Sequence, residues 1–312
     1  MDNLCHSLVG AALGQAGLAR RTTLGMSTLV IANNLPDLDV AVFATNALAV
    51  SFRRGWTHGV LAQVTLPILL TGAMLTYDRL VVRTRVNAPP PASARELLLL
   101  SYVGVLLHVV MDVMNSYGVR LLMPFTGQWF YGDALFIVDP WLYVALGMGW
   151  WRSHRRDASG LAHAARPARI GVALAAVYVL AMLASNTIAR HEVQAGLARA
   201  AQPADTRFMV TPVAVNPFSR EVIVDLGDRY EKGNLWFEPR PHFRPAGFGM
   251  PKGLDDPAAQ AALQSPRARA FLRWSRFPFV QVERNTAPPT IWLNDYRYAN
   301  AGAYGWSATK IQ

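Results

Sequence analysis

The hydrophobic positions in the first 189 residues fall into long runs, which is the pattern of helices that lie in a membrane. Four runs are long enough to cross a bilayer, and they cover residues 59–77, 97–116, 134–151 and 170–189. The pattern therefore predicts an α-helical integral membrane domain with about four transmembrane helices.

Two shorter runs come first, at residues 8–19 and 24–35. Each is about 12 residues long, so as a helix it would measure roughly 18 Å, against a hydrocarbon core of about 30 Å. Arg20 and Arg21 lie between the two runs. We therefore expect a short N-terminal helical hairpin with this arginine pair at its tip.

A turn should follow the hairpin, because Pro36 disfavours helix at the residue before it. Residues 33–39 read Asn-Asn-Leu-Pro-Asp-Leu-Asp, a composition typical of turns. Such a turn would present Asp37 and Asp39 close together. His6, near the other foot of the hairpin, would return to the same level.

The run at residues 97–116 contains two ionisable residues, His108 and Asp112, at a spacing of four. A helix places such residues one turn apart on one face. A charged group at membrane depth costs on the order of 3 kcal/mol or more, so these residues usually face a bundle interior and mark a site. A structural His–Asp pair that holds helices together is the alternative interpretation.

Arginine placement predicts the orientation of the helices. The loops at residues 78–96 and 152–169 are rich in Arg, so the positive-inside rule places both in the cytoplasm. The hairpin tip agrees with this side, whereas Arg53 and Arg54 do not. In this orientation the ionisable residues of the membrane domain gather at its extracytoplasmic end, and residues 190–312 are extracytoplasmic.

Residues 190–312 have a different pattern, in which short β-branched or aromatic stretches alternate with Pro, Gly and Asp. This predicts a small α+β, mainly antiparallel-β domain. The expected strands cover residues 207–215, 221–226, 234–238, 277–283 and 290–298. One helix is expected from Asp256 to about Trp274, interrupted near Ser265. The expected domains are therefore 1–189 and 190–312.

Composition supports a membrane protein, since 52% of the 312 residues are hydrophobic and the mean hydropathy is +0.17. The net charge of +10 is spread along the chain. Because no basic run is interleaved with aromatic residues, we expect no nucleic-acid partner. The single cysteine, Cys5, cannot form a disulfide within the chain.

Three imidazoles and three carboxylates from separate segments form the candidate site. They are His6, Asp37, Asp39, His58, His108 and Asp112. The mixture suits Zn²⁺, with Mn²⁺ or Fe²⁺ as alternatives, better than Ca²⁺, and six groups are enough for one or two ions. Such sites activate water for the hydrolysis of phosphoesters or amides. Asp39 and Asp112 are the candidate catalytic carboxylates, one of which would serve as general base.

Simpler interpretations exist for several of these residues. Asp37 and Asp39 would cap the helix that follows them, His6 would be a surface residue, and His58 would be an interfacial residue. Asp139 precedes a proline, which is typical of a helix N-cap followed by N1 proline, so we expect it to cap a helix rather than to bind metal.

The ordered set of motifs over residues 1–145 resembles the bacterial membrane-bound metal-dependent hydrolase family, also described as LexA-binding, inner-membrane-associated hydrolases. The motifs are His6, Asn34-Leu35-Pro36-Asp37-Leu38-Asp39, Arg54-Gly55-Trp56-Thr57-His58, His108-x-x-x-Asp112 with Asn115-Ser116-Tyr117-Gly118, and Ile137-Val138-Asp139-Pro140. The resemblance implies an integral protein of the bacterial inner membrane, with a metal site at these His and Asp residues.

Two functions remain open at this stage. The first is a metal-dependent hydrolase that acts on a phosphoester or similar substrate at the outer surface of the inner membrane, with membrane lipid or a lipid-linked substrate as partner. The second is a non-enzymatic membrane protein that binds or conducts metal ions or protons and has an outer partner-binding domain. Ligands gathered at one end of the membrane favour the enzyme, because a conduction path would distribute them through its depth.

Overall fold

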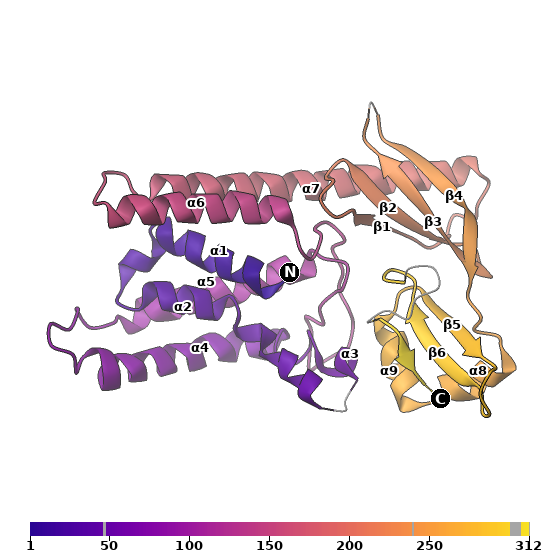
Figure 1. Cartoon of the computed structure of the whole chain (residues 1–312), viewed down its shortest axis with the longest axis horizontal. Coiled ribbons are helices and arrows are strands. Elements are labelled where there is room, and N and C mark those ends of the chain that lie inside the picture. The colour runs from indigo at the N-terminus through magenta and orange to yellow at the C-terminus, as the bar shows by residue number, and fades with distance from the viewer. Residues whose placement is uncertain (46–47, 239, 300–306, 312) are drawn as a thin grey trace. The chain divides into compact units, whose positions relative to one another are not determined.

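The chain divides into two compact units (Figure 1). The structure, a computed structural model, describes residues 1–45, 48–238, 240–299 and 307–311. The helical unit comprises Met1–Ala41 and Arg53–Ser185, and the mixed unit comprises Val42–Phe52 and Asn186–Gln312. Helix α7 (Arg166–Arg199) runs through the division. The expected domain boundary at residue 189 stays a prediction.

The N-terminal hairpin is confirmed. Helix α1 (Asn3–Gln15) packs against α2 (Gly25–Ala32), and a 3₁₀ turn (Leu18–Arg21) lies between them. Asp2 starts α1 by accepting hydrogen bonds from the backbone of its first turn. The hairpin is followed by η2 (Leu35–Ala44), a 3₁₀ segment that contains the expected aspartate pair.

Three helices of the described residues are long and apolar enough to cross a membrane. The first is α4 (Val60–Tyr77), which continues through a π-helical turn to Val82, and the second is α5 (Ala94–Val113). The third is α7. These helices correspond to three of the four expected spans.

Helix α6 (Pro140–Ala158) takes the place of the fourth expected span and differs from it. It begins at Pro140 rather than at residue 134, because Asp139 is its N-cap and accepts hydrogen bonds from the backbone of its first turn. Its last turns contain Arg155, Arg156 and Asp157, which make it too polar to count among the candidate spans. Of the four expected transmembrane helices, three therefore have the length and apolar composition to cross a membrane, and the capping role of Asp139 is confirmed.

Helix α5 packs against neighbours on two sides. Its residues Leu97 and Val105 share an apolar cluster with Ala32 of α2 and Leu70 of α4. Met111, near its other end, joins a second cluster formed with α1, α6 and α7. Ser101, His108 and Asp112 of α5, each 0% exposed, are enclosed by protein in this arrangement.

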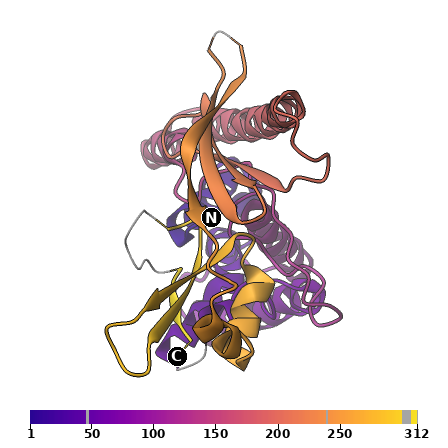
Figure 2. The same ribbon diagram turned by 90° about the vertical axis from the view of Figure 1, so that its right-hand side faces the viewer.

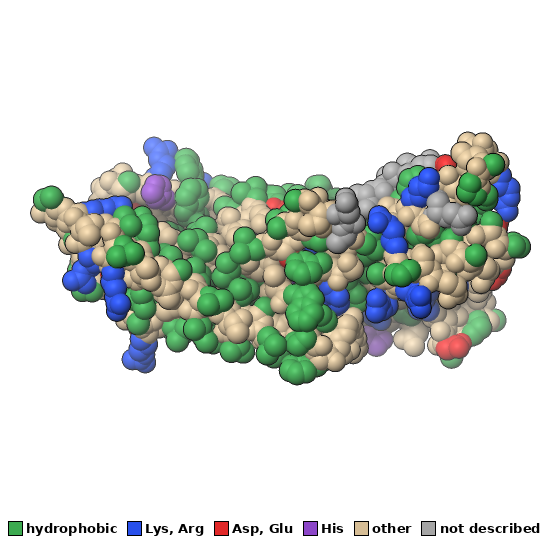
Figure 3. Space-filling model, turned by 90° about the horizontal axis from the view of Figure 1, so that it is seen from below, with side chains coloured by type: hydrophobic (Ala, Val, Ile, Leu, Met, Phe, Trp, Pro, Cys, Tyr) green, Lys and Arg blue, Asp and Glu red, His purple; other side chains and the backbone are tan. Residues whose placement is uncertain are grey.

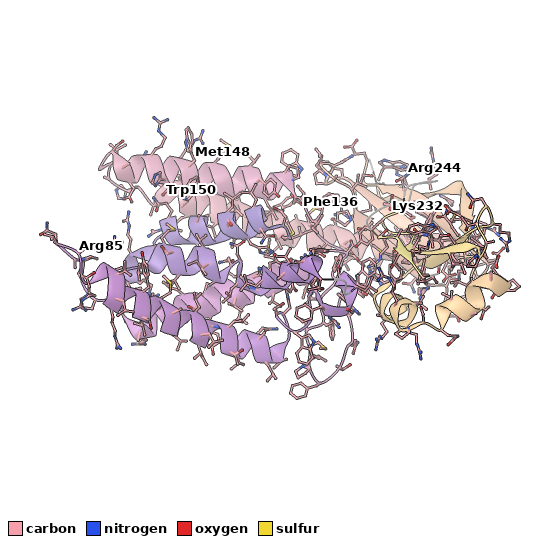
Figure 4. The ribbon with its side chains drawn as sticks, turned by 60° about the horizontal axis from the view of Figure 1, so that its bottom comes forward. Arg85, Phe136, Met148, Trp150, Lys232 and Arg244 are labelled. Carbon is pink, nitrogen blue, oxygen red and sulfur yellow. The ribbon has the colours of Figure 1, made fainter. Side chains whose placement is uncertain are left out.

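The surface of the helical unit matches this arrangement. Seen from below, hydrophobic side chains cover much of it, and Lys and Arg side chains gather at one end (Figure 3). Arg85, in the loop after α4, and Phe136, in the segment before α6, lie at opposite ends of the unit (Figure 4).

In the described residues of the mixed unit, the strands form two antiparallel sheets rather than the one small sheet that the strand pattern predicts (Figure 2). The first sheet has the order β1 (Phe208–Pro212), β2 (Ser219–Asp225), β3 (Arg229–Trp236), β4 (His242–Pro251). The last turns of α7 cover it through Ala189, Val193 and Leu197. Strand β4 was missed because Pro and Gly residues interrupt its hydrophobic pattern.

The second sheet follows two short helices. Helices α8 (Pro257–Leu263) and α9 (Pro266–Trp274) confirm the expected interruption at Ser265, which caps α9. Strands β5 (Pro278–Glu283), β6 (Thr290–Asp295) and β7 (Thr309–Lys310) form the sheet. A small antiparallel-β domain after the helices is therefore confirmed.

Candidate metal centre

All six candidate ligands are buried in the helical unit, since none is more than 3% exposed. His6 is on α1, and Asp37 and Asp39 are on η2. His58 is in the loop before α4, and His108 and Asp112 are on α5. This burial contradicts the simpler interpretations in which His6 is a surface residue and His58 is an interfacial residue.

His108 is held by a close approach of two helices. Gly104 lies one turn before it on α5, and a Cβ atom added there would lie 2.4 Å from the Cβ atom of Ala32 on α2. The missing side chain lets α5 reach the end of α2, where Nδ1 of His108 lies 2.7 Å from the carbonyl oxygen of Asn33. A carbonyl oxygen only accepts, so Nδ1 carries the proton and Nε2 presents a lone pair.

His58 is oriented by a chain of hydrogen bonds. The hydroxyl of Thr57 donates to Oδ2 of Asp39 at 3.0 Å, because a carboxylate only accepts. The same hydroxyl oxygen lies 2.9 Å from Nδ1 of His58, so it accepts the proton of that nitrogen. Nε2 of His58 therefore also presents a lone pair.

These two lone pairs meet two carboxylates. The Nε2 atoms of His58 and His108 lie 3.1 Å apart, and Oδ2 of Asp112 lies 3.3 Å and 3.5 Å from them. Oδ1 of Asp37 lies 3.9 Å from both and has no hydrogen-bond partner among the described residues. The four ligand atoms all lie within 4.8 Å of one another. Four acceptor atoms this close repel one another unless a proton or a cation lies between them, and a bound metal ion would remove that repulsion.

The other oxygen of Asp112 faces cations instead. Oδ1 accepts a hydrogen bond from Nη2 of Arg54 at 3.1 Å and another from the amino group of Met1. Arg54 also donates to Oδ1 of Asn115 at 2.9 Å. The buried carboxylate is thus compensated on one side and open to a metal on the other.

The structure places His6 and Asp39 beside the group of four. The His6 ring stacks on His108 with a centroid distance of 3.9 Å, and its Nε2 lies 3.3 Å from Oδ1 of Asp112. Asp39 lies behind His58 and also accepts from the backbone nitrogen of Arg54 at 2.7 Å. Their assignment as metal ligands stays a prediction, as does a catalytic role for Asp39 or Asp112.

Arg53 and Arg54 also belong to the site, although the sequence pattern predicts only His and acidic residues there. Arg53 contacts Asp37 and Asp39 at 3.7 Å and 3.4 Å, and Arg54 is 2% exposed. The sequence did contain a signal, because this pair was the exception to the positive-inside rule. Arginines that pair with buried carboxylates do not report topology.

The donor set fits a transition metal. Imidazoles and carboxylates are ligands of Zn²⁺, Mn²⁺ and Fe²⁺, and each ring donates the N–H of its Nδ1 to an oxygen, as metal-binding histidines usually do. The described residues gather one such group, formed by Asp37, His58, His108 and Asp112, and this group could bind a metal ion. Oδ1 of Asp112 is occupied by Arg54, so this carboxylate offers Oδ2 to an ion.

Comparison with known proteins extends over the same part of the chain. The family described as YdjM inner membrane protein matches residues 1–193, which include all six candidate ligands. A protein of Bacillus subtilis (strain 168), described as uncharacterized protein YfhP, is 24% identical over 156 residues, which are 46% of this chain and 44% of YfhP. The chain thus spans less than half the length of this relative. No solved structure matches the chain.

Proposed function

The chain belongs to the YdjM inner membrane protein family, and from that premise we propose that it is a metal-dependent hydrolase. One observation carries the proposal. The Nε2 atoms of two histidines face each other at 3.1 Å, and the hydrogen bond of each Nδ1 leaves both with lone pairs directed at two carboxylates. A divalent cation is the group that such an arrangement accommodates.

Each residue has a distinct part in this proposal. Asp37, His58, His108 and Asp112 would hold the ion, with Zn²⁺ as the preferred metal. When bound, the ion supplies Lewis-acid activation of water and of the bond to be broken. The carbonyl of Asn33 keeps the His108 ring in its orientation.

The arginines favour an anionic substrate. Arg54 is a fixed positive charge in a buried environment beside Asp112, and Arg53 is a second one beside Asp37. Fixed cations stabilise negative charge that develops during reaction, and they do so more strongly where water is excluded. A phosphoester is therefore the substrate class we propose, with a carboxylic ester as the nearest alternative.

We also propose that the site faces the extracytoplasmic side. The helical unit carries its Arg-rich loops at the end opposite Phe136, and the positive-inside rule assigns such loops to the cytoplasm (Figure 4). By the same rule the mixed unit would be extracytoplasmic. Arg53 and Arg54 no longer oppose this orientation, since both pair with carboxylates of the site.

Elemental analysis of detergent-purified protein tests the metal site. The wild-type protein should retain one transition-metal ion per chain, and Asp37→Ala should lose it. Asp78→Ala is the matched control, because Asp78 is equally buried at 3% exposure but binds the backbone of Ala92 at the other end of the unit. If Asp37→Ala and Asp78→Ala both retain the metal content of the wild type, Asp37 is not a ligand.

Hydrolysis is tested with a panel of phosphomonoesters, phosphodiesters, carboxylic esters and amides. We expect the purified protein to hydrolyse a phosphoester, a chelator to abolish this activity, and Zn²⁺ or Mn²⁺ to restore it. A protein that binds one ion per chain but hydrolyses nothing in the panel would favour the ion-binding alternative, and the site would then be structural or sensory.

A further inference from the structure

The loops that carry the buried ligands present hydrophobic side chains to the outside. Asp37 and Asp39 are 3% and 2% exposed, yet Leu38 between them is 62% exposed. Trp56 is exposed two residues before the buried His58. The same short segments therefore direct charged groups inward and apolar groups outward.

Three such segments are joined to one another by hydrogen bonds. The backbone nitrogen of Arg54 donates to Asp39, and the backbone nitrogen of Arg120 donates to the carbonyl of Arg54 at 2.8 Å. The backbone nitrogen of Val60 donates to the carbonyl of Leu121 at 3.0 Å. Residues 37–40, 53–60 and 118–125 consequently form one surface around the metal centre.

We name the exposed apolar side chains of this surface the collar. It consists of Leu38, Val40, Trp56, Val60, Leu122 and Phe125. Single exposed apolar residues are common on proteins, but a group that shares three joined loops is not, and Phe125 is 77% exposed. Val60 starts α4, a candidate membrane span, so the collar continues the apolar surface of that helix.

One cation connects the collar with the metal centre. The side chain of Arg53 is 20% exposed, so part of it reaches the surface, while its guanidinium contacts the buried carboxylates of Asp37 and Asp39. Apolar side chains that share a loop with a partly exposed cationic side chain match the two parts of a lipid, an apolar chain and an anionic phosphate.

We propose that the metal centre is entered from the lipid and that its substrate is a membrane amphiphile with an anionic phosphate group. The collar contacts the apolar chain at the level of the lipid headgroups, and Arg53 binds the phosphate. The identity of the substrate rests on the proposed hydrolase function. The contact between the collar and lipid does not, because it can be measured without an activity assay.

The depth of the collar is measured with single-cysteine variants in a Cys5→Ser background, labelled with an environment-sensitive fluorophore and placed in lipid nanodiscs. Labels at Leu38→Cys and Phe125→Cys should be quenched by lipids with a nitroxide near the headgroup and protected from aqueous iodide. Val86→Cys is the control, since Val86 is apolar and 92% exposed but lies beside Arg85 in the Arg-rich loop, and iodide should quench it.

Two results would contradict the proposal that the collar contacts lipid. Collar labels quenched by iodide as efficiently as the Val86 label would place the collar in water. Collar labels protected from both quenchers would show that a protein surface, such as a second copy of the chain, covers it. Metal content and hydrolysis measured on the same preparations separate this failure from a failure of the hydrolase proposal.

The role of Arg53 is measured by native mass spectrometry with a short-chain phosphatidic acid and a polyprenyl phosphate as probes. Loss of a hydrogen bond to a charged group should weaken binding of the accepted lipid about tenfold or more in Arg53→Gln. Arg83→Gln, in the Arg-rich loop, should bind as the wild type does. Equal binding by both variants, or equal binding of glycerol phosphate and of the lipids, would overturn the assignment.

Discussion

The substitution Gly104→Ala tests the packing that positions His108 on α5. The added Cβ atom would lie 2.4 Å from the Cβ atom of Ala32 and 3.1 Å from the backbone nitrogen of Asn33. Carbon atoms in good contact are about 3.5 to 4.0 Å apart, so α2 and α5 must separate by about 1 Å or more. Neither neighbour is the end of a flexible side chain, so the helices themselves have to move.

Two effects should follow from that separation. Overpacking of this kind costs about 1 to 3 kcal/mol of stability. The bond from Nδ1 of His108 to the carbonyl of Asn33, now 2.7 Å, would be stretched beyond hydrogen-bonding distance. Loss of such an orienting bond typically weakens metal binding by about 10 to 100 times.

Gly72→Ala is the matched control, because Gly72 lies in α4 and an added Cβ there meets nothing within 4 Å. Alanine favours helix over glycine by up to about 1 kcal/mol, so this variant should be as stable as the wild type or more stable. Thermal unfolding and competition with a metal chelator are measured for both. If Gly104→Ala matches Gly72→Ala in melting temperature and metal affinity, the helix contact does not position His108.

Three further predictions concern the metal site, the mixed unit and the topology. His108→Ala should lose the metal, whereas Asp139→Asn should keep it and cost about 1 kcal/mol or less as a weakened helix cap, and elemental analysis with thermal unfolding checks both. Burial alone would raise the pKa of Asp295, but the Arg297 guanidinium holds it below its ordinary value. Its stabilising effect should therefore be complete above about pH 4, the pKa range of the unfolded chain, and be lost as the pH falls through the lower pKa of the folded state, so urea unfolding of Asp295→Asn should show a flatter pH dependence than the wild type between pH 3 and 7. Alkaline phosphatase fused after Gln312 should be active, whereas a bright cytoplasmic fluorescent fusion at that position would reverse the proposed topology.

The sequence alone predicted the elements whose signals are local. Long apolar runs identified α4, α5 and α7, because the length and composition of a run are properties of neighbouring residues. Asp139 before a proline identified the start of α6 as a cap, and Ser265 marked the break between α8 and α9. Strand β4 lacks such a signal, because its pairing with β3, and not its own pattern, makes it a strand.

Residue types and spacing also identified which histidines and aspartates lie together. His108 and Asp112 share a helix face by spacing alone, and the turn at Pro36 brought Asp37 and Asp39 to one level. The sequence could not predict which of these residues form the group of four candidate ligands and which lie beside it. That division depends on which atom of each side chain meets which neighbour, and the neighbours lie far away along the chain.

Only the tertiary structure decided which side-chain atoms face one another in the candidate metal centre. It turns the ring of His108 toward the site through Asn33, 75 residues away, and it sets Asp39 behind His58. It also pairs Arg54 with Asp112, which a topology rule based on single residues could not anticipate. The physical reason is that lone pairs, protons and charges at this site are fixed by contacts between segments, and such contacts exist only once the helices have packed.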